Sequence, residues 1–324
     1  MTIVDHFETF HGLPVFTLPE LPEPGEETLP AAGDVAWRLD CCAAGDIPFA
    51  ELWRSFTDRV PSTQVRALVI GPWWDDEYTE LRPALELIVA DADRFPALRA
   101  LFLADVTGEE CEISWLQLTD ITPVLERFPQ LEELGVRGGD SQGLGEEPLS
   151  LRPVRHDALR VLRFESGGLP GQVVRSVGAC ELPALERLEL WLGVSQYGGD
   201  ATVADLAPLL VQGRFPALRH LGVQNSEVQD EMAAALASAR VVAQLESLSL
   251  SMGTLTDTGA EALLLGRPLG HLKRLDLRHH FLSESMADRI RTAFDATGTE
   301  VDLSDHRTPD SWGDQEWRYV AVSE

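Results

Sequence analysis

A six-residue phrase, LxxLxL in conservative variants, recurs at near-regular intervals along most of this chain. Its eight copies begin at residues 65, 98, 131, 159, 185, 218, 245 and 272, so the steps between them are 26 to 33 residues. A ninth, degenerate copy begins at Gly298 and keeps Val301 and Leu303 in its last two slots. Periods of this length are typical of repeat proteins in which each unit stacks on the next. The recurrence therefore predicts one solenoid of about nine repeats.

Each phrase predicts a short strand, because its apolar residues alternate over a run that is too short for a helix. Helical periodicity follows most copies, in segments 81–94, 119–128, 202–212, 230–239, 258–266 and 284–294. Strands and helices that alternate in one direction give parallel strands with every helix on the same side. We therefore expect an α/β horseshoe with a concave parallel sheet and convex helices.

The ends of the chain are predicted to complete this array. Residues 1–60 are interpreted as an N-terminal arm and capping segment, with a strand over 35–39 and a helix over 49–60 that cover the first repeat. Segment 17–30 is rich in proline and glutamate, which favours a loose linker. Residues 61–304 form the predicted solenoid. Residues 305–324 form a tail that we expect to fold back onto the last repeat.

Residues 65–303 resemble leucine-rich-repeat proteins, and the repeat over 245–272 is similar to the ribonuclease-inhibitor type. The chain departs from the common pattern just after the strand, where an asparagine is usual. The residues at that position here are Gly139, Gly167, Gly193, Ser226, Gly253 and His280.

Four shorter phrases resemble an uncharacterised actinobacterial leucine-rich-repeat family over essentially the whole chain. They are Cys111–Trp115, Phe164–Pro170, Leu190–Gly193 and the tail from Tyr319 to Glu324. The genes of that family tend to lie beside radical-SAM-like, ATP-grasp-like and hydrolase-like genes. The resemblance thus implies an alternative role, as an accessory or enzyme-like component of a bacterial peptide- or small-molecule-modification pathway.

The chain carries a formal net charge of −27. A field of this sign repels phosphate backbones and anionic lipid headgroups, which argues against nucleic-acid and membrane partners. It favours a protein or peptide partner, particularly a basic one, although acidic residues also serve simply to keep a surface soluble. The chain shows no signal-peptide pattern and no apolar run of membrane-spanning length, so we expect a cytoplasmic protein.

The third, fifth and seventh slots of each phrase should point out of the concave face, because side chains alternate along a strand. In the early repeats these slots are apolar: Ala67, Val69, Ala100, Phe102 and Ala104. A patch of this kind calls for a cover, which is either a partner or, as we expect, the N-terminal arm with its segment 13–16. In later repeats Arg137 and Glu165 share a slot on neighbouring strands, as do Arg163 and Glu189. Ion pairing on a solvent-exposed face is expected there, ahead of a charge-recognition site.

Three long steps place extra residues after strands, in segments 71–79, 104–118 and 191–201. These loops contain six aromatic residues: Trp73, Trp74, Tyr78, Trp115, Trp191 and Tyr197. They also contain the acidic residues Asp75, Asp76, Glu77, Asp105, Glu109, Glu110, Glu112 and Asp200. Aromatic faces beside carboxylates suit an arginine-bearing peptide or protein. The alternatives are aromatic rings that only pack the loops down, and a divalent-metal site built on Asp75, Asp76, Glu109, Glu110 and Glu112.

Catalytic motifs are not found in the chain. No Gly-rich phosphate loop follows a strand, and neighbouring residues such as His279 and His280 should point in different directions rather than share a metal. His220 is interpreted as a surface histidine. We therefore predict a non-enzymatic protein- or peptide-binding scaffold without cofactor, metal or catalytic residue. Its candidate partner-binding residues are the six aromatics above together with Arg163, Glu165, Glu189, His220 and Arg278.

Overall fold

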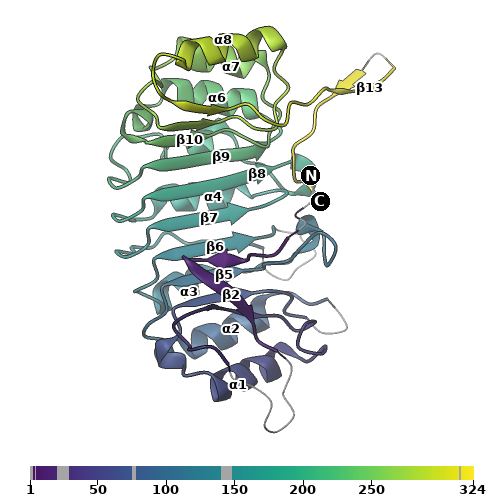
Figure 1. Cartoon of the computed structure of the whole chain (residues 1–324), viewed down its shortest axis with the longest axis vertical. Helices are drawn as coiled ribbons and strands as arrows, with labels where there is room; N and C mark the ends of the chain where they lie inside the picture. Colours follow the sequence, from purple (N-terminus) through teal and green to yellow (C-terminus); the bar gives the residue numbers. More distant parts are fainter. Residues whose placement is uncertain (1–2, 4, 20–28, 75–77, 140–147, 314) are drawn as a thin grey trace.

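A computed structural model describes residues 3, 5–19, 29–74, 78–139, 148–313 and 315–324, and all structural statements concern these residues. They form a mixed α/β fold around a twelve-stranded sheet whose strands follow one another in chain order (Figure 1). Only the first pair, β1 with β2, is antiparallel. The strands are β1 (Thr9–Phe10), β2 (Leu13–Thr17), β3 (Ala36–Leu39), β4 (Ala67–Ile70), β5 (Ala100–Leu103), β6 (Glu133–Arg137), β7 (Val161–Glu165), β8 (Arg187–Gly193), β9 (His220–Ser226), β10 (Ser247–Ser249), β11 (Arg274–Asp276) and β12 (Glu300–Asp302).

The repeated phrase sets the register of this sheet. The fourth slot of each copy lies beside the fourth slot of the next, as Leu68 beside Leu101 and Leu188 beside Leu221. The same slot continues through Leu248 and Leu275 to Val301. From Leu68 to Leu275 these leucines are at most 1% exposed. Burial of each side chain is worth about 1.5 to 3 kcal/mol, so the ladder of leucines fixes the stacking of the strands.

Eight α-helices are found in the described residues, and they pack behind the sheet in Figure 1. Their buried side chains join the slot-four and slot-six residues in one main core. Side chains on the opposite face, which we call the front face, belong to a separate cluster. The helices are α1 (Phe49–Arg59), α2 (Arg82–Ala90), α3 (Thr122–Arg127), α4 (Gly171–Ala179), α5 (Val203–Leu206), α6 (Gln229–Ser238), α7 (Asp257–Leu265) and α8 (Glu284–Phe294).

The helix predictions hold for α6, α7 and α8 and, over shorter spans, for α2 within 81–94 and α3 within 119–128. The segment 202–212 is helical only over α5. Pro208 contributes to the early end of α5 because it has no N–H to donate to a preceding carbonyl, although Ala207 before it keeps helical backbone. Helix α4 was not predicted, since its glycines and valines are poor helix formers. A Cβ atom on Gly178 would lie 2.8 Å from Pro208, so this glycine is needed for α4 to approach the α5 segment.

The capping strand and helix predicted for the first repeat are present as β3 and α1. Trp37 of β3 extends the ladder beside Leu68 and is fully buried. Strand β2 pairs with β3, so that the N-terminal arm is part of the same sheet. Of the linker predicted over 17–30, residues 20–28 lie outside the described residues. Leu18 is fully buried, so the segment is anchored at its start.

The C-terminal tail takes a different course from the one expected. After a small antiparallel pair, β13 (Asp310–Trp312) and β14 (Gln315–Trp317), the chain crosses the carboxyl ends of the parallel strands, an edge that we call the rim. The tail contacts Met252, Asn225 and Tyr197 there. It therefore runs back past several repeats, and the prediction that it folds onto the last repeat alone was wrong. No α-helix in the described part of the chain has the length and apolar character needed to cross a bilayer.

Candidate functional site

The N-terminal arm covers the apolar part of the front face, as predicted. Phe10 is 6% exposed and packs with Ala67, Val69, Ala100 and Phe102, while Phe7, Leu13 and Val15 border the same cluster. The ring centroids of Phe7 and Phe102 lie 4.6 Å apart in an edge-to-face arrangement. Ala104 is an exception to the predicted slot pattern. Its left-handed backbone, at a φ of 69°, ends the strand and turns its side chain into the main core.

Beside the apolar cluster, Asp105 joins the arm to the sheet. This carboxylate is fully buried and accepts hydrogen bonds from Arg38, from Arg137 at 3.3 Å and from the backbone N–H of Phe7 at 3.3 Å. The guanidinium of Arg137 lies 5.5 Å from the ring centroid of Phe7 and 5.3 Å from that of Phe102. The arm therefore excludes water from buried charges as well as from apolar side chains.

The predicted ion pairs on neighbouring strands are formed. Arg137 Nε donates to Glu165 at 2.8 Å, and Arg163 Nε lies 2.8 Å from a carboxylate oxygen of Glu189. The face they occupy is not solvent-exposed as expected, because Arg137 and Glu165 are only 4% and 3% exposed. Partners satisfy these charges within the fold. Residues Arg163, Glu165 and Glu189 are thus held in place by each other before any partner arrives.

The ladder of polar residues continues past Glu189 to the last strands. His220 lies 3.3 Å from Glu189 and 2.7 Å from the Ser247 hydroxyl, and Arg278 contacts Asp276 at 3.0 Å. Burial raises the pKa of Glu189, but the hydrogen bond from His220 and the charges of Arg163 and Arg187 outweigh it and bring the pKa to about 2. Glu189 therefore stays ionised down to strongly acidic pH.

On the rim, three of the predicted aromatic residues pack against one another. The ring centroids of Trp73 and Trp74 are 5.0 Å apart, and those of Trp74 and Tyr78 are 4.9 Å apart. Trp73 is buried and its indole N–H donates to the Thr79 carbonyl at 2.8 Å. The Tyr78 hydroxyl accepts a hydrogen bond from the Gln117 N–H, and burial raises the pKa of Tyr78 well above its usual range. These rings hold two rim loops together.

Trp115 differs from that cluster because 56% of its surface is exposed. Its indole N–H already donates to the Glu112 carboxylate at 2.9 Å. The side chain therefore exposes an apolar ring to solvent, and its one polar group already has a hydrogen-bond partner. Glu109 and Glu110 are exposed in the same loop.

Trp191 and Tyr197 lie farther along the rim. Trp191 belongs to β8 rather than to the loop after it, and it is half-buried against the core. The Tyr197 hydroxyl donates a hydrogen bond to Glu324, which raises the pKa of Tyr197 to about 12. The six predicted aromatic residues thus fall into a packed cluster, one exposed ring, the half-buried Trp191 of β8, and Tyr197 in contact with the tail.

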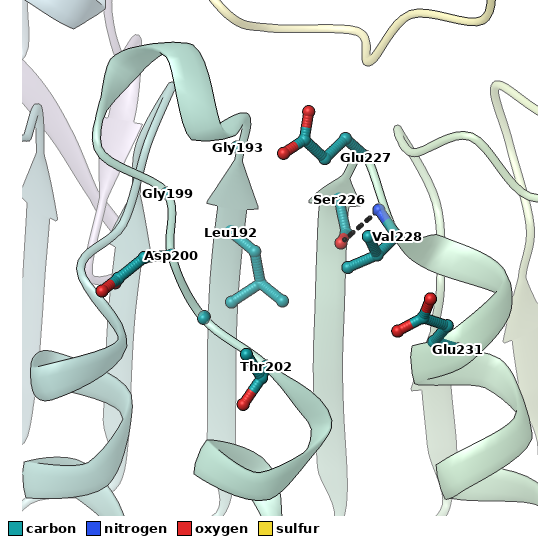
Figure 2. Close-up of a pocket in the computed structure, with 10 residues that line it drawn as sticks. Leu192, Gly193, Gly199, Asp200, Thr202, Ser226, Glu227, Val228 and Glu231 are labelled. Carbon is teal, nitrogen blue, oxygen red and sulfur yellow. Dashed lines mark hydrogen bonds between the residues drawn. The ribbon is translucent and has the colours of Figure 1, made fainter.

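A cleft of about 200 Å³ opens between the segments that follow β8 and β9 (Figure 2). Figure 2 shows the carboxylates of Glu227 and Glu231 beside it, whereas the side chain of Asp200, from the loop that lines it, points away toward the neighbouring helix. Asp200 accepts a hydrogen bond from Gly171 N–H at 2.6 Å, and Glu227 accepts one from Ser195 N–H at 2.8 Å. Two of the three acids therefore also brace loops, and the cleft adds negative charge to the rim.

Metal and catalytic candidates do not converge in the part of the chain that the structure describes. No three His, Cys, Asp or Glu side chains there are grouped as a metal site, and Asp75, Asp76 and Glu77 lie outside the described residues. The Glu110 carboxylate accepts from Thr107 N–H at 2.8 Å and lies 3.1 Å from His6. His279 and His280 point to different partners, the carbonyls of Tyr319 and Leu303.

Several residues that hold the arm and the tail in place were not predicted from the sequence. Arg38 and Asp40 pair beneath the arm, and Asn225 and Met252 contact the tail. The sequence does contain a signal for Asn225 and Met252. Together with His279 they recur every 27 residues, each directly before the position at which the common repeat has an asparagine and this chain does not. Asparagine also tolerates left-handed backbone better than most residues.

No model of a known protein family matches the chain, and a search of curated proteins finds no match. A solved structure does match: the crystal structure of a protein from Bacteroides fragilis, a structural-genomics target, superposes with a TM-score of 0.72 at 30% sequence identity. The match covers 79% of this chain and 70% of that chain. Over most of its length, this chain is therefore similar to a bacterial protein of mixed α/β fold in both sequence and structure.

Proposed function

We propose that the chain is a leucine-rich-repeat solenoid of about nine repeats that serves as a non-enzymatic protein- or peptide-binding scaffold. The in-register ladder from Leu68 to Leu275 and the chain-order stacking of the strands support the repeat assignment. The front face corresponds to the concave face of such a solenoid. We propose a cytoplasmic location for the protein, as expected from the sequence.

The observation that carries the binding proposal is the exposure of Trp115. A tryptophan whose N–H is already satisfied gains little from water, and it contributes strongly when a partner covers its ring. The surrounding loop offers exposed Glu109 and Glu112 side chains, and the Glu112 carboxylate lies at the edge of the ring. The rim around Trp115 is therefore suited to a partner that brings an arginine onto an aromatic face.

The charge of the molecule supports the same kind of partner. The net charge of −27 accelerates the approach of a basic protein or peptide, and the acidic cleft beside β8 and β9 extends the negative surface along the rim. On the front face, Arg187 and Arg278 keep about half of their side-chain surface exposed although both are paired. We assign them a secondary role at the edge of the contact.

The test compares two exposed apolar side chains on different parts of the molecule. Trp115→Ala removes the rim anchor, and Leu265→Ala, at the end of α7 with 76% exposure, is the matched control. Partners are captured from a native lysate with wild-type chain, identified, and purified for titration calorimetry. We expect Trp115→Ala to weaken binding by about 2 kcal/mol, or roughly 30-fold, because interface tryptophans are frequent hot spots. Leu265→Ala should bind as wild type.

Equal affinity of both variants for every purified partner would contradict the proposal for the rim. An effect of Leu265→Ala alone would move the binding surface to the helical side. The role in a modification pathway stays a prediction from the resemblance, to be examined by asking whether a captured partner is such an enzyme.

A further inference from the structure

The last six described residues, Tyr319 to Glu324, lie along the rim, and we call them the tail segment. We call the surface beneath them, formed by Asn225, Met252, His279 and Gly167, the groove. Val320, Ala321 and Val322 are 5%, 3% and 4% exposed, although the neighbouring Arg318 and Tyr319 are exposed. In Figure 1 the segment returns from the β13 region toward the ends of β8 and β7. A short stretch of small apolar side chains is thus buried far from the repeat that precedes it in sequence.

The groove holds the main chain of the tail segment. His279 Nε2 donates to the Tyr319 carbonyl at 3.0 Å, and the Ala321 N–H donates to the Met252 carbonyl at 2.7 Å. The side-chain amide of Asn225 accepts from the Val322 N–H at 2.9 Å and donates to the Val322 carbonyl. These contacts involve atoms that every peptide has, so they select the course of the backbone, and the space around the side chains selects the residue types.

Three of the groove residues are equivalent positions of consecutive repeats. Asn225, Met252 and His279 are 27 residues apart, and their φ angles of 55°, 70° and 56° are all left-handed. Each is fixed by a backbone hydrogen bond to the next repeat: Asn225 N–H to Ser251, Met252 N–H to Arg278 and His279 N–H to Ser304, at 2.8 to 3.1 Å. The repeats themselves, rather than the tail segment, therefore hold the groove in shape.

The far end of the groove is matched to the chain that lies in it. A Cβ atom on Gly167 would lie 2.3 Å from the Ser323 carbonyl oxygen, so only glycine leaves room for the backbone there. Beyond it, the Tyr197 hydroxyl donates to the Glu324 carboxylate. The groove thus accepts a short segment with small apolar side chains and, beyond them, an acidic one.

We propose that this groove is a binding site for a short peptide supplied by another molecule, and that the tail segment is its built-in competitor. The peptide class is the one that the contacts define: small apolar residues such as valine and alanine, read through their main chain, followed by an acidic side chain. This inference deepens the proposed function because the groove shares its rim, and it uses no contact of Trp115. An attached segment competes at an effective concentration in the millimolar range, so the external peptide binds weakly until the tail segment is displaced.

The experiment uses the full chain and a fluorescein-labelled peptide with the sequence of residues 319–324, followed by fluorescence anisotropy. In the variant Ala321→Pro with Val322→Asp, the tail segment loses one main-chain donor and would bury a charge, which should release it. We expect this released variant to bind the peptide at least about tenfold more tightly than the wild type does. Addition of Asn225→Gly, which tolerates the left-handed backbone but lacks the amide, should reduce that affinity by about tenfold or more.

Two controls distinguish recognition of the peptide main chain from nonspecific binding. One control peptide has the same sequence but is N-methylated at the residues equivalent to Ala321 and Val322. It keeps every side chain and lacks the two main-chain N–H donors, so it should not bind. Trp115→Ala in the released variant should leave peptide affinity unchanged, so loss of a protein partner without loss of the peptide would affect the proposed function alone.

The proposal is overturned if the released variant melts as a folded protein yet does not bind the peptide at millimolar concentration, or if it binds the N-methylated peptide equally well. If the released variant does not fold, Gly167→Ala supplies the release by steric exclusion of Ser323, and the peptide is shortened to Tyr-Val-Ala-Val to avoid the same clash. Binding of that shorter peptide by Gly167→Ala but not by wild type supports the proposal, and its absence overturns it.

Discussion

The N-terminal arm and the tail segment both lie against the sheet, but different atoms hold them in place. The arm inserts Phe10 among Ala67, Val69 and Phe102 and shields the buried charge of Asp105. The tail segment is held by main-chain hydrogen bonds, which it exchanges with the Asn225 amide and donates to the Met252 carbonyl, and its small side chains Ala321 and Val322 join the main core. Burial of large rings stabilises the fold by several kcal/mol, whereas each hydrogen bond contributes about 1 kcal/mol net. We therefore expect the arm to contribute more to the stability of the fold than the tail segment, which should be able to leave without unfolding the repeats.

The largest test of this contrast is Phe102→Ala, which removes the ring on which the arm packs. Loss of a buried phenylalanine should lower the free energy of unfolding by about 3 to 5 kcal/mol, measured by urea denaturation. The arm should also open, so the Val15 amide, bonded to the Glu8 carbonyl at 2.8 Å, should exchange faster. Phe294→Ala in α8 is the control, because it also removes a buried ring but leaves the arm in place. Equal protection of Val15 in both variants would contradict the role of Phe102.

The second test concerns the ion pairs that continue from the arm along the front face. The folded-state pKa of Glu189 is about 2, below the ordinary value of 4.5, so its ionised form stabilises the fold at neutral pH. This contribution, on the order of 3 kcal/mol, is fully present above about pH 4.5 and is lost as the pH falls toward 2. The difference in urea midpoint between wild type and Glu189→Gln should therefore shrink over that range. Parallel pH profiles of the two proteins would refute the assignment.

A smaller effect is expected from Gly167→Ala at the tail segment. The added methyl group collides with the Ser323 carbonyl and lies 3.3 Å from the Ile113 side chain, which must shift slightly. Gly167 does not adopt left-handed backbone, so the substitution adds no backbone strain. Stability should fall by no more than about 2 kcal/mol, while the Ala321 and Val322 amides lose their protection from hydrogen exchange. Gly139→Ala at the same slot of an earlier repeat is the matched control. Tail protection that survives in Gly167→Ala would show that the contact is not tight.

The smallest effect on stability belongs to the proposed binding residue. Trp115→Ala should change the free energy of unfolding by less than about 0.5 kcal/mol, because more than half of the ring is exposed. Thermal denaturation followed by circular dichroism measures this directly. A loss of several kcal/mol would assign Trp115 to the core and remove the main support for a binding rim.

The same contrast explains which parts of the structure the sequence could predict. The register from Leu68 to Leu275 follows from a periodic pattern of large apolar residues, and the cover over Phe102 follows from the apolar slots around it. Both depend on side chains, which the sequence specifies directly. Burial of the Arg137 and Glu165 pair could not be predicted, because it depends on where Phe7 lies.

The course of the tail segment was also beyond prediction, for a physical reason. Most of its hydrogen bonds are made by backbone atoms, which are the same in every residue, and its buried side chains, Ala321 and Val322, are small. Gly167 contributes only the absence of a side chain. Likewise, α4 was hidden because Gly178 serves close packing against Pro208 rather than helix propensity. The rim aromatics were recognised as a group, but their division into packed Trp73 and exposed Trp115 depends on loop geometry.

Amide hydrogen exchange on the wild-type chain, measured over a range of low urea concentrations, compares the two covers directly. If the arm is part of the core and the tail segment is exchangeable, the Leu18 amide, bonded to the Arg38 carbonyl at 2.9 Å, should open only with extensive unfolding and respond strongly to urea. The Ala321 and Val322 amides should exchange through local opening, at a lower free energy that urea barely changes. Identical opening free energies and urea dependences for both segments would contradict this account of the rim.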